Sequence, residues 1–232
     1  MRGAPRAESM TMTTRLYQFI GSPFCAKVRK ILDFKGVDYE VIEVDYLERK
    51  ELIAASGQIM VPALTLESGE TIADSARIAA KLEETYPEPT ILPPSWSGIH
   101  RALADYIDNQ LEDILFRAAI PDEMEYWRRR GADREAFWRL VRERRYGAGF
   151  VDRAIGEHAH HVARAREALL PFEESLGERA FLLGRIGLAD FALYGQLYYF
   201  AFTGTLKLPT TLPRLREYFL RIDSISSKPD AK

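Results

Sequence analysis

The residues of this chain whose types and spacing best suit chemistry form a short run, Gly21-Ser22-Pro23-Phe24-Cys25. The run lies between a candidate strand, Leu16–Ile20, and a candidate helix, Ala26–Lys35. A strand that turns sharply into a helix aims the free backbone N–H groups of the first helical turn at whatever lies in the turn. Such a place favours an anion, and a thiolate is an anion. The run therefore predicts a thiol-handling site that includes the Ser22 hydroxyl and the Cys25 thiol.

The Ser22 hydroxyl would favour the ionised form of a thiol bound beside it. A free thiol has a pKa near ~8.5, so only a small part of it is ionised at neutral pH. A hydrogen bond to a charged group contributes roughly 1.5–3 kcal/mol, and a helix N-terminus contributes about 0.3–1 kcal/mol. Because ~1.4 kcal/mol corresponds to one pKa unit, the two effects together lower the thiol pKa by about two units. Serine can donate this bond without losing its own proton.

Both residues also have a purely structural interpretation. Serine at the N-cap with proline at the next position is a common start of a helix, so Ser22-Pro23 could simply cap the helix. Cys25 lies one turn into the helix, where a small thiol can be buried packing. The alternative is a redox or ligand-facing thiol whose pKa is lowered by the helix end.

Two further pairs of residues strengthen the functional interpretation. Val61-Pro62 precedes a candidate hairpin, and a cis proline there would leave the backbone of Val61 free to pair with a peptide-like ligand as an added strand. Asp74-Ser75 begins the next helix. It is either a plain cap or a site where Ser75 and the helix N–H groups hold a carboxylate while Asp74 holds an ammonium group.

The elements that must position these residues alternate between strands and helices up to about Tyr86. After the first strand and helix we expect a strand at Tyr39–Val44 and a helix at Leu47–Ala55. A hairpin with a glycine turn at Gly69 and a helix at Asp74–Thr85 complete this region. The first two strands enclose a helix, so they should be parallel with a right-handed crossover.

The remainder of the chain reads as helical after a proline-rich stretch that marks a linker. We expect a first long helix that stops near Pro121, and a helix near the end that is apolar on all sides and therefore central. The predicted helices are Ile99–Ala119, Arg134–Tyr146, Ala154–Leu176 with a possible bend at Pro171, Leu188–Phe200 and Leu212–Ile222. The predicted divisions are a disordered tail at 1–14, an α/β domain at 15–86, a linker at 87–96 and an all-helical domain at 97–232.

Composition excludes several classes of protein. The chain has 232 residues, of which 47% are hydrophobic, and a formal net charge of −2. This near-neutral balance argues against nucleic acid as a partner, and no apolar run approaches the ~20 residues of a membrane-spanning helix. A single cysteine excludes an internal disulfide and a multi-cysteine metal site. With no apolar signal core at the start, these features predict a cytoplasmic protein.

The ungapped run from Ser22 to Arg29 resembles the serine-led active-site motif of zeta-like and related bacterial members of the cytosolic glutathione transferases. The resemblance extends to the two-domain layout from about Arg15 to Ile222. It implies a thioredoxin-like α/β domain followed by an all-α helical bundle. It also implies glutathione as co-substrate, a homodimer, and an activity in which the glutathione thiolate attacks or isomerises a small electrophile during detoxification.

The resemblance also implies roles for particular residues. Ser22 matches the catalytic serine, Val61-Pro62 matches the Val-Pro whose proline is cis and whose valine backbone binds the cysteinyl part of glutathione, and Asp74-Ser75 matches the pair that binds the γ-glutamyl group. The predicted catalytic residues are Ser22 and Cys25. The predicted glutathione-binding residues are Phe24, Met60, Val61, Pro62, Asp74 and Ser75, and the predicted second-substrate residues are Tyr106 and Asn109.

The chain departs from the family pattern at two places. The usual Ser or Thr at the cap of the second-domain helix is Gly187, although Asp190 is present to bond back to the start of that helix. The stretch before Val61 lacks the usual Asn-Pro-x-Gly-Lys pattern, so the resemblance predicts no residues for the glycyl end of glutathione. Ser-Pro-Phe-Cys is also similar to the Cys-Pro-Phe/Tyr-Cys of glutaredoxins and of the glutaredoxin-like prostaglandin E synthase, but Ser22 replaces the nucleophilic cysteine.

Two other clusters have alternative interpretations. His158 and His161 share a helix face, but the sequence shows no further metal ligands at supporting spacing, so we predict no metal. A stretch rich in arginine and interleaved with acids favours a solvated, salt-bridged helix face; the alternative is a wall of the second-substrate pocket or an entrance for an anionic substrate. Its arginines are Arg128, Arg129, Arg130, Arg134, Arg139, Arg142, Arg144 and Arg145.

The sequence leaves three functions open. The first is a glutathione transferase, and the second is a non-catalytic interaction module with the same fold. The third is a thiol-disulfide oxidoreductase that uses Cys25 alone.

Overall fold

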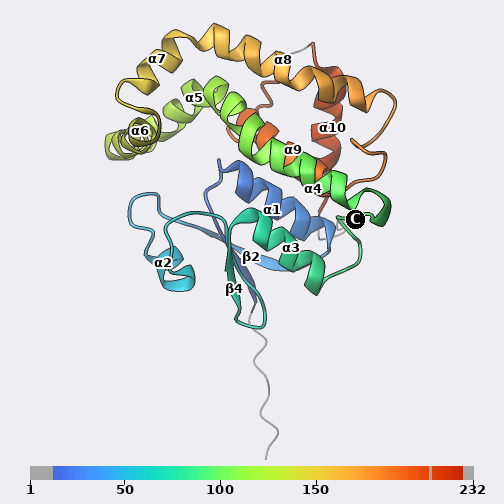
Figure 1. Cartoon of the computed structure of the whole chain (residues 1–232). Helices are drawn as coiled ribbons and strands as arrows, with labels where there is room; N and C mark the ends of the chain where they lie inside the picture. Colours follow the sequence, from blue (N-terminus) through green and yellow to red (C-terminus); the bar gives the residue numbers. More distant parts are fainter. Residues whose placement is uncertain (1–12, 209–210, 227–232) are drawn as a thin grey trace, which may run out of the picture.

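A computed structural model describes residues 13–208 and 211–226 of the chain. Figure 1 shows a smaller α/β region stacked against a larger helical region, with helices α1 (Pro23–Phe34), α4 (Ser97–Tyr106) and α9 (Leu188–Leu197) close to the boundary between them. The fold confirms a thioredoxin-like domain followed by an all-helical domain. Nearly all of the predicted N-terminal tail lies outside the described residues, and strand β1 (Thr14–Gln18) begins at its last residue.

The α/β region contains one mixed sheet of four strands. Its order is β2-β1-β3-β4, where β2 is Tyr39–Glu43, β3 is Ala63–Thr65 and β4 is Thr71–Ala73. Strands β1 and β2 are parallel, as a strand-helix-strand unit requires, and β3 pairs antiparallel with both β1 and β4. The predicted hairpin and the predicted parallel pair are therefore both confirmed.

Residue alternation along β1 separates two apolar clusters. Leu16 joins the main core with residues of α1 and α3 (Ser75–Thr85), whereas Tyr17 joins a small cluster with Leu52 of α2 (Lys50–Ser56). Successive side chains of a strand point to opposite faces, so the two clusters lie on opposite faces of the sheet. Helices α1 and α3 thus cover one face and α2 covers the other, which leaves the start of α1 at the edge that meets the helical region (Figure 1).

The helical region is built around α9. Every residue from Ala189 to Leu197 is buried, which confirms the prediction of a central helix without a polar face. The other elements are the short 3-10 helix η1 (Pro94–Trp96), a π-helical segment η2 (Ile107–Leu111), α5 (Glu112–Arg128), α6 (Ala132–Tyr146), α7 (Phe150–Gly156), α8 (His158–Leu176), the 3-10 helix η3 (Tyr198–Phe200) and α10 (Pro213–Asp223).

Two predicted helix boundaries were wrong. Helix α5 continues through Pro121 to Arg128, because the residues before the proline, Ala118 to Ile120, are buried and tertiary packing holds the helix together there. The predicted helix Ala154–Leu176 is two helices that meet at Glu157. Gly156 precedes this break, and glycine is a poor helix former. Pro171 lies inside α8 and does not end it.

The two regions meet where α1 packs on α9. An added Cβ at Gly195 of α9 would lie 2.5 Å from the backbone oxygen of Pro23, so only glycine permits this approach. Lys27 of α1 is 1% exposed and forms a 2.5 Å ion pair with Asp108 of the π-helical segment. These contacts fix the start of α1, and with it Ser22, against the helical region.

The start of α9 shows how the chain compensates for a glycine cap. The Asp190 carboxylate accepts hydrogen bonds from the N–H groups of Gly187 and Leu182, both at 2.9 Å, as predicted for Asp190. The His100 ring occupies the space of the missing side chain, since an added Cβ at Gly187 would lie 2.4 Å from it. His100 Nδ1 accepts the N–H of Ala189 at 3.4 Å. A side chain from α4 thus replaces the usual serine or threonine.

Candidate functional site

Ser22 is the N-cap of helix α1. Its backbone is extended, Pro23 takes the first helical position, and the Ser22 hydroxyl oxygen accepts the Cys25 N–H at 3.4 Å. The capping interpretation is therefore confirmed. It does not exclude a second role, because a hydroxyl that accepts one hydrogen bond can still turn its own O–H to a ligand. Ser22 borders the large cleft between the two regions of the molecule.

Cys25 does not have the surroundings of a reactive thiol. It is fully buried, and burial raises the pKa of its thiol to about 11, even though Ser22 and the backbone of Phe19 favour the thiolate. Reactive cysteines are partly exposed and have lowered pKa values. The structure therefore gives no support to the predicted catalytic role of Cys25, and it fits the alternative in which the thiol is core packing.

The residues around the hairpin lie next to Ser22. Val61-Pro62 is a cis peptide bond, as the family resemblance implies. Phe24, Met60 and Val61 border the same cleft as Ser22, and the Met60 side chain is exposed. The paired residues of β3 begin at Ala63, so the backbone of Val61 lies outside the strand pairing, and Val61 borders the cleft.

Asp74-Ser75 forms the N-terminus of α3 beside this hairpin. Asp74 has a φ of 80°, and its carboxylate accepts the N–H groups of Ala76 and Arg77, both at 3.0 Å. The Asp74 N–H donates to the Pro62 carbonyl at 3.3 Å, which joins the two predicted pairs directly. Val61 therefore borders the cleft together with Ser22, and Asp74-Ser75 is joined to this group through Pro62, although Pro62, Asp74 and Ser75 are not among the residues that line the cleft.

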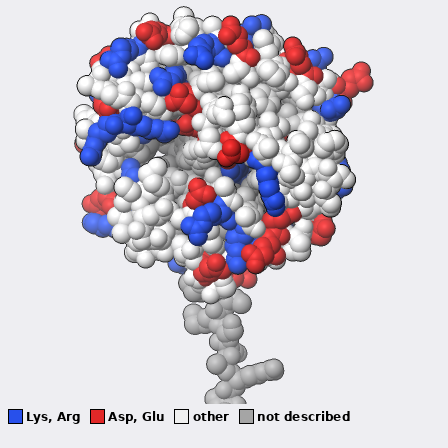
Figure 2. All heavy atoms as spheres, in the orientation of Figure 1, with Lys and Arg blue, Asp and Glu red and all other residues white. Residues whose placement is uncertain are grey.

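The cleft itself measures about 1030 Å³ including its open mouth. Figure 2 shows this face of the molecule hollowed between the two regions, with Lys or Arg side chains along part of the rim. Its α/β wall consists of Ser22 and its neighbours together with the loop after β2. Its helical wall is strongly aromatic and comes from α5, α6, η3 and the residue Phe202.

Helix α5 contributes a face that the sequence analysis did not identify. Glu112, Phe116, Glu123 and Trp127 line the cleft at spacings of four, seven and four residues, which places them on one side of the helix. The predicted Tyr106 and Asn109 are not among the lining residues. Both lie before α5, at or within the π-helical segment, and the Asn109 amide donates instead to Asp105. The helical spacing from Glu112 onward was a signal that could have identified the face of α5 that lines the cleft.

The arginine-rich stretch divides into two environments. Arg142 and Arg145 line the cleft, and Arg142 donates to Glu123 at 3.1 Å and to the Tyr46 hydroxyl at 3.2 Å. For Arg142, whose side chain is 22% exposed, the interpretation as a solvated face was wrong, because α6 folds back along α5 and turns this residue to the cleft. Arg145 also borders the cleft, but its side chain is 63% exposed and pairs with Glu112 at 3.8 Å, which agrees with a solvated, salt-bridged face.

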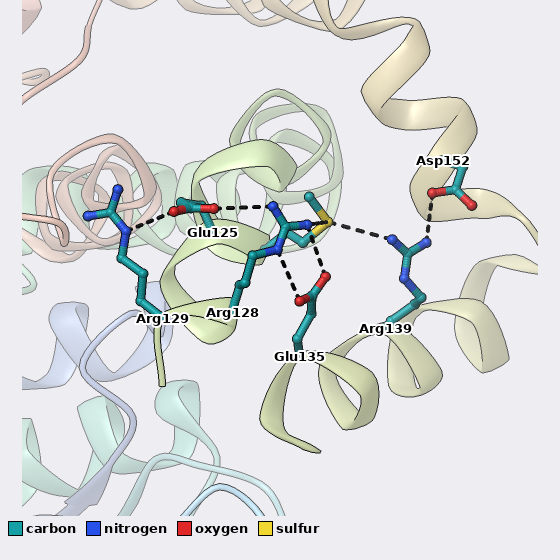
Figure 3. Close-up of polar contacts among 7 residues, drawn as sticks. Glu125, Arg128, Arg129, Glu135, Arg139 and Asp152 are labelled. Carbon is teal, nitrogen blue, oxygen red and sulfur yellow. Dashed lines mark hydrogen bonds and ion pairs between the residues drawn. The ribbon is translucent and has the colours of Figure 1, made fainter. Parts of the chain in front are cut away.

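The other part of the stretch is a surface network. Figure 3 shows Glu125 between Arg128 and Arg129, Glu135 beside Arg128, and Arg139 reaching Asp152. The side chain of Arg129, for example, is 75% exposed. Here the predicted salt-bridged face is confirmed, and such exposed pairs contribute little to stability.

Neither a metal centre nor a membrane span emerges from the residues that the structure describes. Within residues 13–208 and 211–226, no group of three or more His, Cys, Asp or Glu side chains is arranged to hold a metal ion. Within the same residues, no helix has the length and apolarity that crossing a membrane requires.

Comparisons with known proteins agree with this architecture. Residues 16–90 match the family described as "Glutathione S-transferase, N-terminal domain", and residues 155–221 match "Glutathione S-transferase, C-terminal domain". Together the two matches span more than half of the chain. The chain belongs to the glutathione S-transferase superfamily.

Individual relatives place the chain within that superfamily. It is 28% identical over 193 residues to a maleylacetoacetate isomerase of Pseudomonas aeruginosa, covering 79% of this chain and 80% of the relative. It is 40% identical over 68 residues to the mouse prostaglandin E synthase 2, which covers 29% of this chain and 17% of that protein. The fold matches a glutathione S-transferase of Ceriporiopsis subvermispora solved with glutathione, with a TM-score of 0.77, 19% identity and coverage of 95% and 100% of the two chains.

Proposed function

We propose that the protein is a glutathione-dependent enzyme that uses Ser22 to hold the glutathione thiolate. The observation that carries this proposal is that one residue is both the N-cap of α1 and part of the cleft wall. A sulfur in the cleft beside Ser22 would meet the hydroxyl and the positive end of a 12-residue helix together. Both favour the thiolate over the thiol.

The rest of glutathione would lie along the edge that joins Ser22 to Asp74-Ser75. The free backbone of Val61 suits the cysteinyl part, with the cis Pro62 turning the chain and with Phe24 and Met60 at its sides. Ser75 and the start of α3 suit the γ-glutamyl carboxylate, and Asp74 suits the ammonium group. These roles follow the family resemblance and fit the contiguous placement of the residues.

The second substrate would be a small apolar or aromatic electrophile in the cleft. Its helical wall presents Phe116, Tyr126, Trp127 and Phe202, and such a surface favours an apolar ring. The thiolate would attack the electrophilic carbon and displace a leaving group or add to a double bond. Addition followed by rotation and loss of the thiolate would isomerise a double bond, the type of reaction named by the maleylacetoacetate isomerase relative.

The decisive experiment compares thiolate formation in the wild type and in Ser22→Ala. Titration with glutathione at neutral pH should give the ultraviolet absorbance of a bound thiolate in the wild type, and the apparent pKa of that thiol should rise by about one to two units in the variant. Cys25→Ala is the matched control and should keep the wild-type thiol pKa. Absence of glutathione binding at millimolar concentration would instead favour a non-catalytic module.

The oligomeric state and the location follow the same resemblance. We propose a cytoplasmic homodimer that contributes to the detoxification of electrophiles. Light scattering coupled to size exclusion tests the first part directly, since a dimer has twice the 26.5 kDa mass of the chain.

A further inference from the structure

The cleft holds two buried carboxyl groups whose partners differ. Glu123 accepts the Trp138 indole N–H at 2.8 Å and forms an ion pair with Arg142 at 3.1 Å. Glu112 accepts the Tyr199 hydroxyl at 3.0 Å through one oxygen, and its other oxygen lies 3.8 Å from Arg145, whose side chain is 63% exposed. Among the residues that the structure describes, Glu112 therefore has no ion pair as close as the one that holds Glu123.

Glu112 occupies a distinctive place in the fold. It is the first residue of α5, directly after the π-helical segment Ile107–Leu111, and segments of this kind frequently occur at functional sites. Glu112 is 6% exposed, and it borders the same cleft as Ser22. Tyr199, which contacts Glu112, is followed three residues later by Phe202. Phe202 lies against Gly21, so the helical wall that includes Glu112 reaches the turn that holds Ser22.

We propose that Glu112 is a catalytic acid that donates a proton to the second substrate when glutathione adds to an activated double bond. This inference rests on the proposed function, since it needs the thiolate beside Ser22. The thiol proton has already left to solvent when the thiolate forms. The sulfur electron pair then makes the carbon–sulfur bond at the β-carbon of an enone, and the double-bond pair moves toward the carbonyl to give an enolate. Glu112 supplies the proton that the enolate needs and regains one from water.

The surroundings of Glu112 suit a protonated acid. Burial raises its pKa, while Tyr199 and Arg145 oppose the shift and Asp113 and Glu123 add to it. From α6, Tyr146 also faces it. A hydroxyl that donates to one oxygen leaves the other oxygen of the carboxyl group to carry the proton. Tyr199 is thus a positioning residue for Glu112.

A pair of electrophiles separates this role from a structural one. Benzylideneacetone, a neutral enone, needs a proton after attack, whereas chlorodinitrobenzene loses chloride and needs none. In Glu112→Gln the ratio of kcat/KM for the enone to kcat/KM for the aryl chloride should fall about 100-fold, as expected for loss of general acid catalysis. Glu125→Gln, a Glu-to-Gln change in the surface network of the same helix (Figure 3), should leave the ratio unchanged.

The pH profile gives an independent readout. In the wild type the same ratio should fall as pH rises and Glu112 ionises, and in Glu112→Gln it should be flat. Tyr199→Phe should raise the pH at which the ratio falls, because Tyr199 opposes the rise in the pKa of Glu112. If Glu112→Gln does not fold, this Tyr199→Phe measurement is the test. An unchanged ratio in Glu112→Gln would overturn the role of Glu112. Lack of wild-type turnover with both electrophiles would instead overturn the proposed function and this inference with it.

Discussion

The two walls of the cleft are built on different principles. On the α/β wall, Ser22, Val61 and Asp74 are positioned by local backbone features, namely two helix starts and one cis peptide bond. On the helical wall, Glu112 and Arg142 are positioned by contacts between separate elements, Glu112 with Tyr199 of η3 and Arg142 with Glu123 of α5 and with the Tyr46 hydroxyl. The first wall presents hydrogen-bonding groups whose positions depend on local backbone structure. The second supplies a shape and a charge pattern that depend on how whole helices pack.

The first prediction tests whether the ion pair between Glu123 and Arg142 in the helical wall stabilises the fold. Glu123→Gln keeps an acceptor for Trp138 but leaves Arg142, whose side chain is 22% exposed, without its carboxylate. Removing one partner of such a pair should lower the free energy of unfolding by about 3 kcal/mol. Denaturant titration measures this change.

The matched control for Glu123→Gln is Glu125→Gln on the same helix. The Glu125 side chain is 42% exposed, and within the described part of the chain its ion pairs are those with Arg128 and Arg129 at the surface (Figure 3). Its replacement should change the free energy of unfolding by less than about 1 kcal/mol. If both variants lost the same free energy of unfolding, the division of the arginine-rich stretch into two environments would be contradicted.

The contrast between the walls explains what the sequence could predict. Ser22-Pro23, Val61-Pro62 and Asp74-Ser75 are local patterns, because a cap or a proline acts on residues within one turn of itself. Their placement on one edge follows from a parallel strand pair and a hairpin, which periodicity and a glycine turn also indicate. For this reason the α/β domain and the placement of these three pairs within it were predictable in outline.

The helical wall was not predictable in the same way. Whether Arg142 faces solvent or the cleft depends on how α6 folds back along α5, and no local pattern specifies that contact. The π-helical segment changes the helical register just before Glu112, so a face extrapolated from Tyr106 and Asn109 does not continue into α5. The role of His100 as a cap for α9 needed the structure as well, because 87 residues separate it from Gly187.

The second prediction tests the contact that joins the two walls. Gly195→Ala places a methyl group 2.5 Å from the Pro23 backbone oxygen, so α1 and α9 must separate. This overpacking should cost about 1–3 kcal/mol of stability. It should also lower glutathione affinity, because Pro23 directly follows Ser22. Thermal unfolding with and without glutathione measures both effects.

Gly156→Ala is the control for the glycine substitution. Gly156 lies in the last turn of α7, and apart from its chain neighbours and the backbone of its own helix, no atom of the described residues lies within 4 Å of an added Cβ. Alanine there should leave stability unchanged or raise it by up to about 1 kcal/mol. If Gly195→Ala behaves like Gly156→Ala, the close approach of α1 and α9 is not what positions Ser22.

The third prediction concerns the single thiol of the chain, that of Cys25, which is buried in helix α1 of the α/β region. Because burial raises the pKa of Cys25 to about 11, the folded protein keeps the thiol proton at pH values where the unfolded chain, with an ordinary thiol, has lost it. The folded state then binds more protons than the unfolded state, so stability falls as pH rises from about 8.5 toward 11. At pH values below this window the thiol contributes no pH dependence.

Cys25→Ala isolates this contribution. Partly buried tyrosines such as Tyr39 also have raised pKa values and give the same direction of change, so the comparison must be made between variant and wild type. The alanine variant should lose stability less steeply between pH 8.5 and 10, by up to about 1 kcal/mol per pH unit. Alkylation of native Cys25 by iodoacetamide at pH 8 should likewise be slow until the protein is unfolded. Rapid alkylation of the folded protein would show that the thiol reaches the cleft, and would return Cys25 to the candidates for chemistry beside Ser22.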